Sequence, residues 1–189
     1  IEIDRLDEDT LYQNLAWLAE HQEDIEKKLF KERYPDVIPT LFLYDVTSSY
    51  LEGTCNELAD WGYNRDKKRG KMQIVVGLLT GPDGLPVAVR VFKGNTNDTK
   101  TVSEQIRILA QTFGVKEVTL VGDRGMLKGP QIDQLPEDFR YITAITKPQI
   151  LKMLEDSVIQ YELFTDKVCE VEYSGTRYVL RRNPFRVRE

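Results

Sequence analysis

The chain has 189 residues, of which 41% are hydrophobic and 30% are charged, and its formal net charge at pH 7 is −5. This composition is typical of a globular protein with one sizeable core, and the acidic balance argues against a protein that coats nucleic acid through bulk positive charge. Apolar runs stay well short of the roughly 20 residues that span a membrane, so no membrane association is expected, and the first residues do not form a secretion signal.

The N-terminal segment, residues 1–39, is predicted to contain one amphipathic helix. Apolar residues recur at helical spacing between Thr10 and Arg33, and Thr10 is a suitable N-cap. Two prolines, Pro35 and Pro39, end the helical pattern. A different pattern begins after them.

Three β-strands are predicted next, over residues 40–50, 72–80 and 85–93. The turn sequence Gly81-Pro82-Asp83-Gly84 separates the second strand from the third. These two strands are therefore expected to form an antiparallel hairpin.

Helices and strands then alternate. A helix over 101–113 is expected, capped by Asp98 or Thr99 and closed by Gly114. The continuous apolar run of the fourth strand, 115–122, predicts burial on both faces. The remaining predicted elements are a short helix near 131–135, a fifth strand at 141–146 and a helix over 148–160.

This order predicts an α/β domain over residues 40–160. Its mixed five-stranded sheet has an antiparallel hairpin on one side and helical crossovers on the other. Residues 161–189 change character, because two alternating segments flank Ser174-Gly175 and read as a further hairpin. We interpret this last region as the start of a β-rich unit.

Two aspartates carry the chemical signal. Asp45 and Asp123 are each the first charged residue after a short apolar, strand-forming run, so each is expected to emerge at the end of a buried strand. If these two strands are neighbours in one sheet, the carboxylates meet. A carboxylate pair of this kind holds divalent metal ions for phosphodiester chemistry.

Three short motifs resemble a known family. They are Tyr44-Asp45-Val46-Thr47, the loop Gly94–Asp98, and Gly122-Asp123-Arg124-Gly125. In this order they are similar to the catalytic core of DDE transposases of bacterial insertion sequences, in the branch with an RNase H-like fold and a β-rich insertion. The resemblance covers roughly residues 40–150.

The resemblance implies specific roles for the two aspartates. Asp45 on the first strand and Asp123 after the fourth would bind two Mg²⁺ or Mn²⁺ ions, since these strands are neighbours in an RNase H-like sheet. Such a site performs DNA strand cleavage and strand transfer in cut-and-paste transposition. The implied partners are the insertion-sequence ends and the target DNA, and family members generally assemble as dimers or larger complexes.

The chain departs from the family pattern in two places. An aromatic residue usually stands where this chain has Lys128, and the third acid, a Glu in a Tyr-x-x-Arg-x-x-x-Glu pattern, is replaced after Tyr178 and Arg181 by Phe185. We expect the third acid to lie beyond Glu189, which would make the chain a truncated and inactive core. Glu155 is the local alternative.

Basic residues indicate where DNA would bind. The predicted DNA contacts are Arg65, Lys67, Lys68, Arg69 and Lys71 in one loop, and Arg124 beside Asp123. A solvated loop and a plain salt bridge are the ordinary interpretations of these charges. The aromatic residues Tyr50, Trp61 and Tyr63 lie around the loop, where stacking on bases is one interpretation and core packing is favoured for Trp61.

Two other functions stay open. In the first, the chain would be a complete RNase H-like nuclease with Glu155 as its third ligand. In the second, it would be a non-catalytic DNA-binding or dimerisation fragment whose carboxylates are structural. A zinc site is not expected, because there is one histidine and the two cysteines, Cys55 and Cys169, lack CxxC spacing. Two free thiols are typical of a reducing compartment, which predicts a cytoplasmic protein.

Overall fold

A computed structural model describes residues 7–63, 70–124, 126 and 137–182. The chain divides into two compact units, residues 1–143 and 144–189, and each is described separately. The predicted helix near 131–135 lies outside the described residues. None of the helices within the described ranges is long and apolar enough to cross a bilayer.

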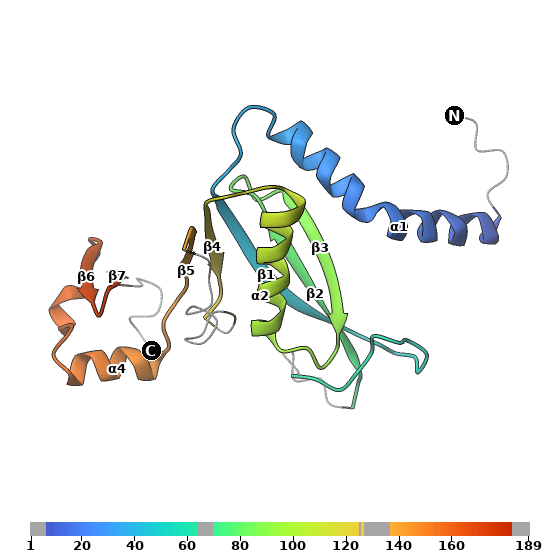
Figure 1. The fold of residues 1–189 in the computed structure, drawn as a ribbon. Coiled ribbons are helices and arrows are strands. Elements are labelled where there is room, and N and C mark those ends of the chain that lie inside the picture. The colour runs from blue at the N-terminus through green and yellow to red at the C-terminus, as the bar shows by residue number, and fades with distance from the viewer. Residues whose placement is uncertain (1–6, 64–69, 125, 127–136, 183–189) are drawn as a thin grey trace. The chain divides into compact units, whose positions relative to one another are not determined.

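The first unit is built on a five-stranded sheet in the order β3-β2-β1-β4-β5 (Figure 1). β1, β2 and β3 are antiparallel neighbours, whereas β4 runs parallel to both β1 and β5. The strands are β1 (Leu41–Tyr50), β2 (Gln73–Thr80), β3 (Pro86–Lys93), β4 (Val118–Gly122) and β5 (Phe139–Ile142). The predicted mixed sheet, its hairpin and the contact of β1 with β4 are confirmed.

The two strands of the parallel side of the sheet, β4 and β5, have other bounds than predicted. β4 begins at Val118 and not at residue 115, because the backbone N–H of Val115 still donates to the Leu109 carbonyl of the preceding helical segment. β5 ends at Ile142, because Thr146 forms a capping box with Gln149 at the start of the next helix. The predicted burial of β4 on both faces is wrong: its residues alternate, and its less buried face lines open pockets.

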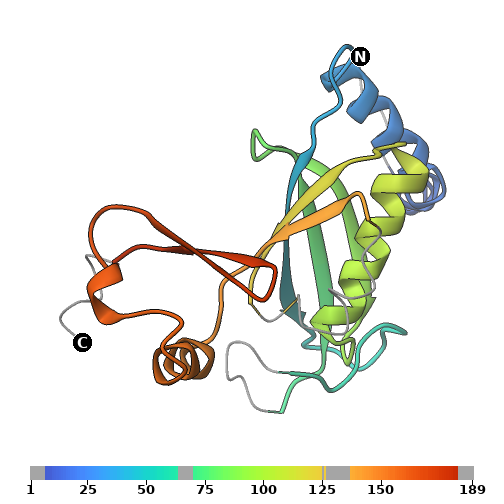
Figure 2. The same ribbon diagram turned by 60° about the vertical axis from the view of Figure 1, so that its left-hand side comes forward.

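One face of the sheet is covered by α2 (Asp98–Arg107) and by the short π-helical segment η1 (Ile108–Thr112) that continues it (Figures 1 and 2). Alternate strand residues pack beneath these helices, as a period of two requires. The fully or almost fully buried side chains include Phe42, Tyr44, Val75, Leu79, Val102, Ile108, Leu109, Val118 and Leu120. This layer is the hydrophobic core of the unit.

The ends of this helical layer refine the prediction. Asn97, with extended backbone angles, is the N-cap of α2, and Asp98 is already helical, so the expected cap at Asp98 or Thr99 is displaced by one residue. At the other end Gly114 adopts a φ of +66°, a conformation that favours glycine and that closes the helix as predicted.

α1 (Glu8–Arg33) begins at the N-cap Asp7, whose carboxylate accepts from the backbone N–H of Thr10 at 2.7 Å. The helix therefore starts before the predicted cap, Thr10. Near its C-terminal end, Phe30 stacks on Phe113 with 4.4 Å between ring centroids and joins the core. The residues from Leu11 to Glu20 are exposed.

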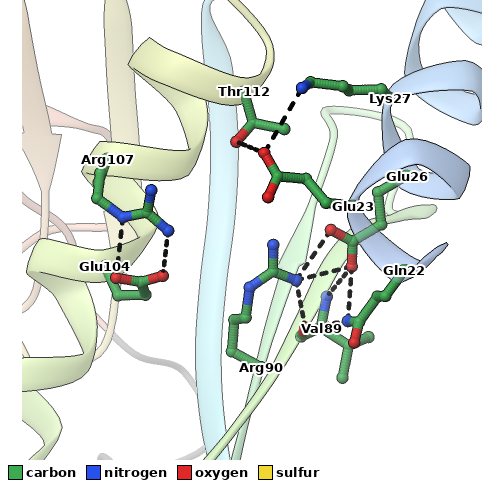
Figure 3. A network of polar contacts seen from close by, with 9 residues as sticks. All are labelled: Gln22, Glu23, Glu26, Lys27, Val89, Arg90, Glu104, Arg107 and Thr112. Carbon is green, nitrogen blue, oxygen red and sulfur yellow. Dashed lines mark hydrogen bonds and ion pairs between the residues drawn. The ribbon is translucent and has the colours of Figure 1, made fainter. Parts of the chain in front are cut away.

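α1 also covers the outer edge of β3, using polar side chains in place of a further strand (Figure 3). The Glu26 carboxylate accepts from the Val89 backbone N–H at 3.1 Å, and the Gln22 amide donates to the Val89 carbonyl at 2.8 Å. Glu26 is 9% exposed and also binds the guanidinium of Arg90 at 2.8 Å. Because β3 is an edge strand, these contacts satisfy backbone groups that would otherwise be open to another chain.

The second unit has its own small core. It contains α4 (Lys147–Glu155), the 3₁₀ turn η2 (Tyr161–Leu163), β6 (Cys169–Tyr173) and β7 (Thr176–Leu180), packed around Met153, Ile159 and Leu180. β6 and β7 form the predicted hairpin, and its two turn residues, Ser174 and Gly175, have φ values of 50° and 73°. Two consecutive left-handed residues are what a tight two-residue hairpin turn requires.

Candidate functional site

Asp45 lies in the middle of β1, five residues before the last strand residue, Tyr50. This corrects the expectation that it stands at a strand end: β1 continues because it pairs with β2 as far as Tyr50. The neighbours Tyr44 and Val46 are buried, whereas Asp45 and Thr47 are exposed on the other face. Strand alternation therefore directs the carboxylate away from the core and places Thr47 on the same face.

Asp123 follows directly after the last residue of β4, as predicted. The last parallel pair between the two strands is Tyr44 with Gly122, so the same register carried one residue further places Asp123 beside Asp45. Neighbouring strands are about 4.8 Å apart. The two aspartates also line one open pocket, together with Leu43, Tyr44, Leu78, Thr80, Val121 and Gly122.

Each carboxylate is oriented by its own backbone. Oδ1 of Asp45 accepts from the N–H of Val46 at 2.8 Å, and Oδ1 of Asp123 accepts from the N–H of Arg124 at 2.7 Å. Within the described part of the chain, neither aspartate forms an ion pair with a lysine or an arginine. Two adjacent negative charges without a cation repel each other, and a bound cation would relieve this repulsion.

The donor set suits a hard divalent cation. Carboxylate oxygens are the ligands that Mg²⁺ and Mn²⁺ prefer, and Mg²⁺ normally binds through one or two carboxylates with water and substrate phosphate completing its shell. Among the described residues no group of three or more His, Cys, Asp or Glu side chains could hold a metal ion. The pair thus fits a metal site that depends on further oxygen ligands.

Behind Asp45, on the core side of β1, Tyr44 packs directly against Gly77 of β2. A Cβ atom at Gly77 would overlap the Tyr44 hydroxyl, so only glycine leaves room for the ring. Burial raises the pKa of Tyr44 to about 12. Its hydroxyl and both amide atoms of Gln105 are buried without a hydrogen-bond partner among the described residues. The contact of Tyr44 with Gly77 was not predicted from the sequence. A glycine inside an apolar strand was the available signal, because it often marks a position where another group packs closely against the backbone.

The side chains of the other predicted site residues, where the structure describes them, form no ion pair with Asp45 or Asp123. Arg65, Lys67, Lys68 and Arg69 lie outside the described residues. Lys71 forms an ion pair with Glu52, and Arg124 is exposed next to Asp123 without a salt bridge to a described acid. Glu155 is the last residue of α4, in the second unit.

The loop beside the sheet also differs from expectation. Trp61, for which core packing was favoured, is 62% exposed, so that prediction is wrong. Asn95 has a structural partner, since its amide donates to Oδ2 of Asp60 at 2.7 Å. The residue that fills the space beneath this loop is Gln73, which is 2% exposed and which the sequence pattern did not single out.

Comparison with known proteins identifies related domains. Residues 38–184 match the family described as Transposase DDE domain. A search of curated proteins gives no match. The fold is similar to that of piggyBac transposase in the cryo-EM structure of its synaptic complex with hairpin DNA, with a TM-score of 0.50 and 12% identity over 78% of this chain and 32% of that one.

A second solved structure, the Mos1 transposase paired-end complex with the left transposon end, gives a TM-score of 0.35 and 10% identity over 85% of this chain and 53% of that one. The chain therefore spans about a third of the piggyBac chain and about half of the Mos1 chain. At 12% identity, the similarity to piggyBac transposase concerns the fold, and it confirms the expected α/β, RNase H-like arrangement of sheet and helices.

Proposed function

Because this chain belongs to the transposase DDE domain family, we propose that it forms the catalytic core of an insertion-sequence transposase, with Asp45 and Asp123 as its first two metal ligands. One observation carries this proposal. The parallel register of β1 and β4 brings Asp45 and Asp123, from the first and the last of the family-like motifs, side by side on the open face of the sheet. A purely structural acid pair would be met by cationic or donor side chains, which these two lack within the described residues.

DDE transposases generally use divalent metal ions, and Mg²⁺ or Mn²⁺ is the cofactor proposed here. When bound, a pair of such ions supplies activation of water or of a DNA 3′-hydroxyl and stabilisation of the leaving oxygen. The protein's part is to hold the two carboxylates at fixed positions, each oriented by the backbone N–H that follows it. Thr47 shares the exposed face of β1 with Asp45 and is available to a DNA phosphate.

DNA is the proposed substrate, as insertion-sequence ends and as target. The solved piggyBac complex contains hairpin DNA, and we extend DNA binding from that protein to this chain. Arg124 is exposed beside Asp123, where a guanidinium would meet a phosphate near the reacting bond. The basic loop with Arg65, Lys67, Lys68, Arg69 and Lys71 is proposed as a backbone contact, and a cytoplasmic homodimer as the working form.

The third acid distinguishes the transposase from the complete nuclease. Glu155 lies in the second unit, at the end of α4. If it were the third ligand, Glu155→Gln in the full-length protein would abolish metal-dependent cleavage as completely as Asp45→Asn does. Our proposal expects Glu155→Gln to retain cleavage, with the third acid supplied by another glutamate.

The proposal is tested by cleavage of DNA carrying the element's ends, in the full-length protein with Mg²⁺ or Mn²⁺. We expect Asp45→Asn and Asp123→Asn each to reduce the cleavage rate by about 10³-fold or more, because the carboxylates act as a unit. Asp24→Asn, at an exposed acid of α1, is the matched control and should cleave normally. Normal cleavage by either site variant would refute the assignment.

A further inference from the structure

Trp61 and Tyr63 form an exposed aromatic pair on the loop between β1 and β2. Their exposed fractions are 62% and 80%. Large aromatic side chains usually bury most of their surface, since each removes a large apolar area from water. Two such rings left in solvent within three residues therefore need an explanation.

The loop that carries them is firmly held. The buried amide of Gln73 donates to the carbonyl of Tyr63 at 3.1 Å and to that of Gly94 at 2.9 Å. Asp60 pairs with Gln73 through both backbone hydrogen bonds, and Oδ1 of Asp60 accepts from the N–H of Trp61 at 2.7 Å. These contacts fix the backbone on both sides of Gly62.

Between the two rings, Gly62 packs closely against Gly94. A Cβ atom at Gly62 would overlap the Gly94 carbonyl oxygen, so only glycine fits at this position. Its neighbours Trp61 and Tyr63 are left exposed. The rings are thus exposed on a backbone that is held in place, to which Asn95 also contributes by donating to Asp60.

The loop follows the strand that carries Asp45. β1 and β4 run parallel, so the chain leaves both strands in the same direction, towards the loop that follows β1 (Figure 1). Asp45 stands five residues before the end of β1, which corresponds to about 17 Å along the strand.

We propose that Trp61 and Tyr63 are a stacking site for unpaired nucleobases of the DNA strand that enters the carboxylate site. This inference rests on the proposed function, because it takes DNA as the substrate. Base faces stack on aromatic rings irrespective of sequence, and such contacts need rings that are exposed and held in place. In sequence the loop leads into the basic residues from Arg65 to Lys71, which supply the charge that a DNA backbone requires, although the stacking site itself consists of the two rings.

The test compares single-stranded and duplex DNA of equal phosphate number, bound to the full-length protein at one salt concentration. We expect Trp61→Ala to weaken binding of a single-stranded oligothymidine by about 10-fold and to leave duplex binding unchanged. Trp61→Phe should restore most of the affinity, because it keeps an aromatic face. Trp17→Ala is the matched control: Trp17 is 52% exposed but lies on α1, and its loss should change neither affinity.

Several results would overturn the proposal. They are unchanged single-strand binding by Trp61→Ala, an equal loss on duplex DNA, an equal loss in Trp17→Ala, or a loss of self-association with normal DNA binding, which would make the rings a protein interface. Asp45→Asn separates this inference from the proposed function. Loss of cleavage with normal oligothymidine binding in Asp45→Asn supports both, and normal cleavage in that variant refutes the catalytic assignment whatever the rings bind.

Discussion

Two acidic regions of the protein differ in exposure and in the number of donors that meet their carboxylates. One is Glu26, at the contact of α1 with β3, and the other is the pair Asp45 and Asp123 on the open face of the sheet. Glu26 is 9% exposed and accepts from Arg90, Gln22 and the backbone of Val89. The two aspartates are exposed, and each is oriented by one backbone N–H. A carboxylate saturated by protein donors fixes structure, whereas an adjacent pair that no lysine or arginine of the described ranges neutralises is available to a cation.

The largest expected effect lies at Glu26. Glu26→Ala removes the ion-pair partner of the Arg90 guanidinium and the acceptor of the Val89 N–H, so we expect the free energy of unfolding to fall by about 3–5 kcal/mol. Urea denaturation followed by circular dichroism measures it. Glu23→Ala is the control, because the hydrogen-bond and ion-pair partners of Glu23 among the described residues are Thr112 and Lys27 at the surface, and its loss should cost far less. Equal costs for the two variants would contradict the structural role of Glu26.

The next largest effect on stability is expected at the contact of Tyr44 with Gly77, on the core side of β1. Gly77→Ala places a methyl group against the Tyr44 hydroxyl, and we expect a loss of about 2 kcal/mol in stability. Tyr44→Phe removes that hydroxyl and should recover part of the loss in the double variant. Gly53→Ala, at a loop position with open space around it, is the control and should be nearly neutral. Independent, additive effects of Gly77→Ala and Tyr44→Phe would argue against the contact.

Alkaline pH should expose the burial of Tyr44. Its folded-state pKa, about 12, lies above the ordinary value of 10. The contribution of protonated Tyr44 to the free energy of unfolding is therefore fully present below pH 10 and is lost as the pH rises from 10 towards 12. The expected loss is up to about 2 kcal/mol. Tyr44→Phe should be less sensitive to pH over this range. Tyr34→Phe should differ less from the parent, because Tyr34 is only partly buried. Parallel pH profiles for parent and Tyr44→Phe would refute this prediction.

The smallest expected effect is on stability at the site itself. Asp45→Asn removes one of two adjacent negative charges, so the metal-free protein should be unchanged or more stable by up to about 1 kcal/mol. Thermal melting in a chelator, and again with Mn²⁺, measures this. A destabilisation as large as that of Glu26→Ala would place Asp45 among the structural acids.

Local patterns in the sequence were sufficient to predict most strands of the sheet. Apolar, strand-forming runs located β1 and β2, and the turn glycines located the hairpins, whereas the position of Asp45 in the middle of β1 was not foreseen. Contacts between distant segments could not be predicted, because they produce no local pattern in the sequence. Examples are the ion pair of Glu26 with Arg90, 64 residues apart, and the hydrogen bond from Gln73 to the carbonyl of Gly94. For the same reason Trp61 was expected in the core, since the sequence does not reveal that a glutamine fills the space beneath its loop.

The central claim is that Asp45 and Asp123 together bind a divalent cation. Titration of the protein with Mn²⁺, followed by electron paramagnetic resonance, tests it without requiring catalysis. We expect weak, saturable binding that is lost in both Asp45→Asn and Asp123→Asn and retained in Glu23→Ala. Absence of binding in the parent, or the same affinity in the parent and both aspartate variants, would contradict it.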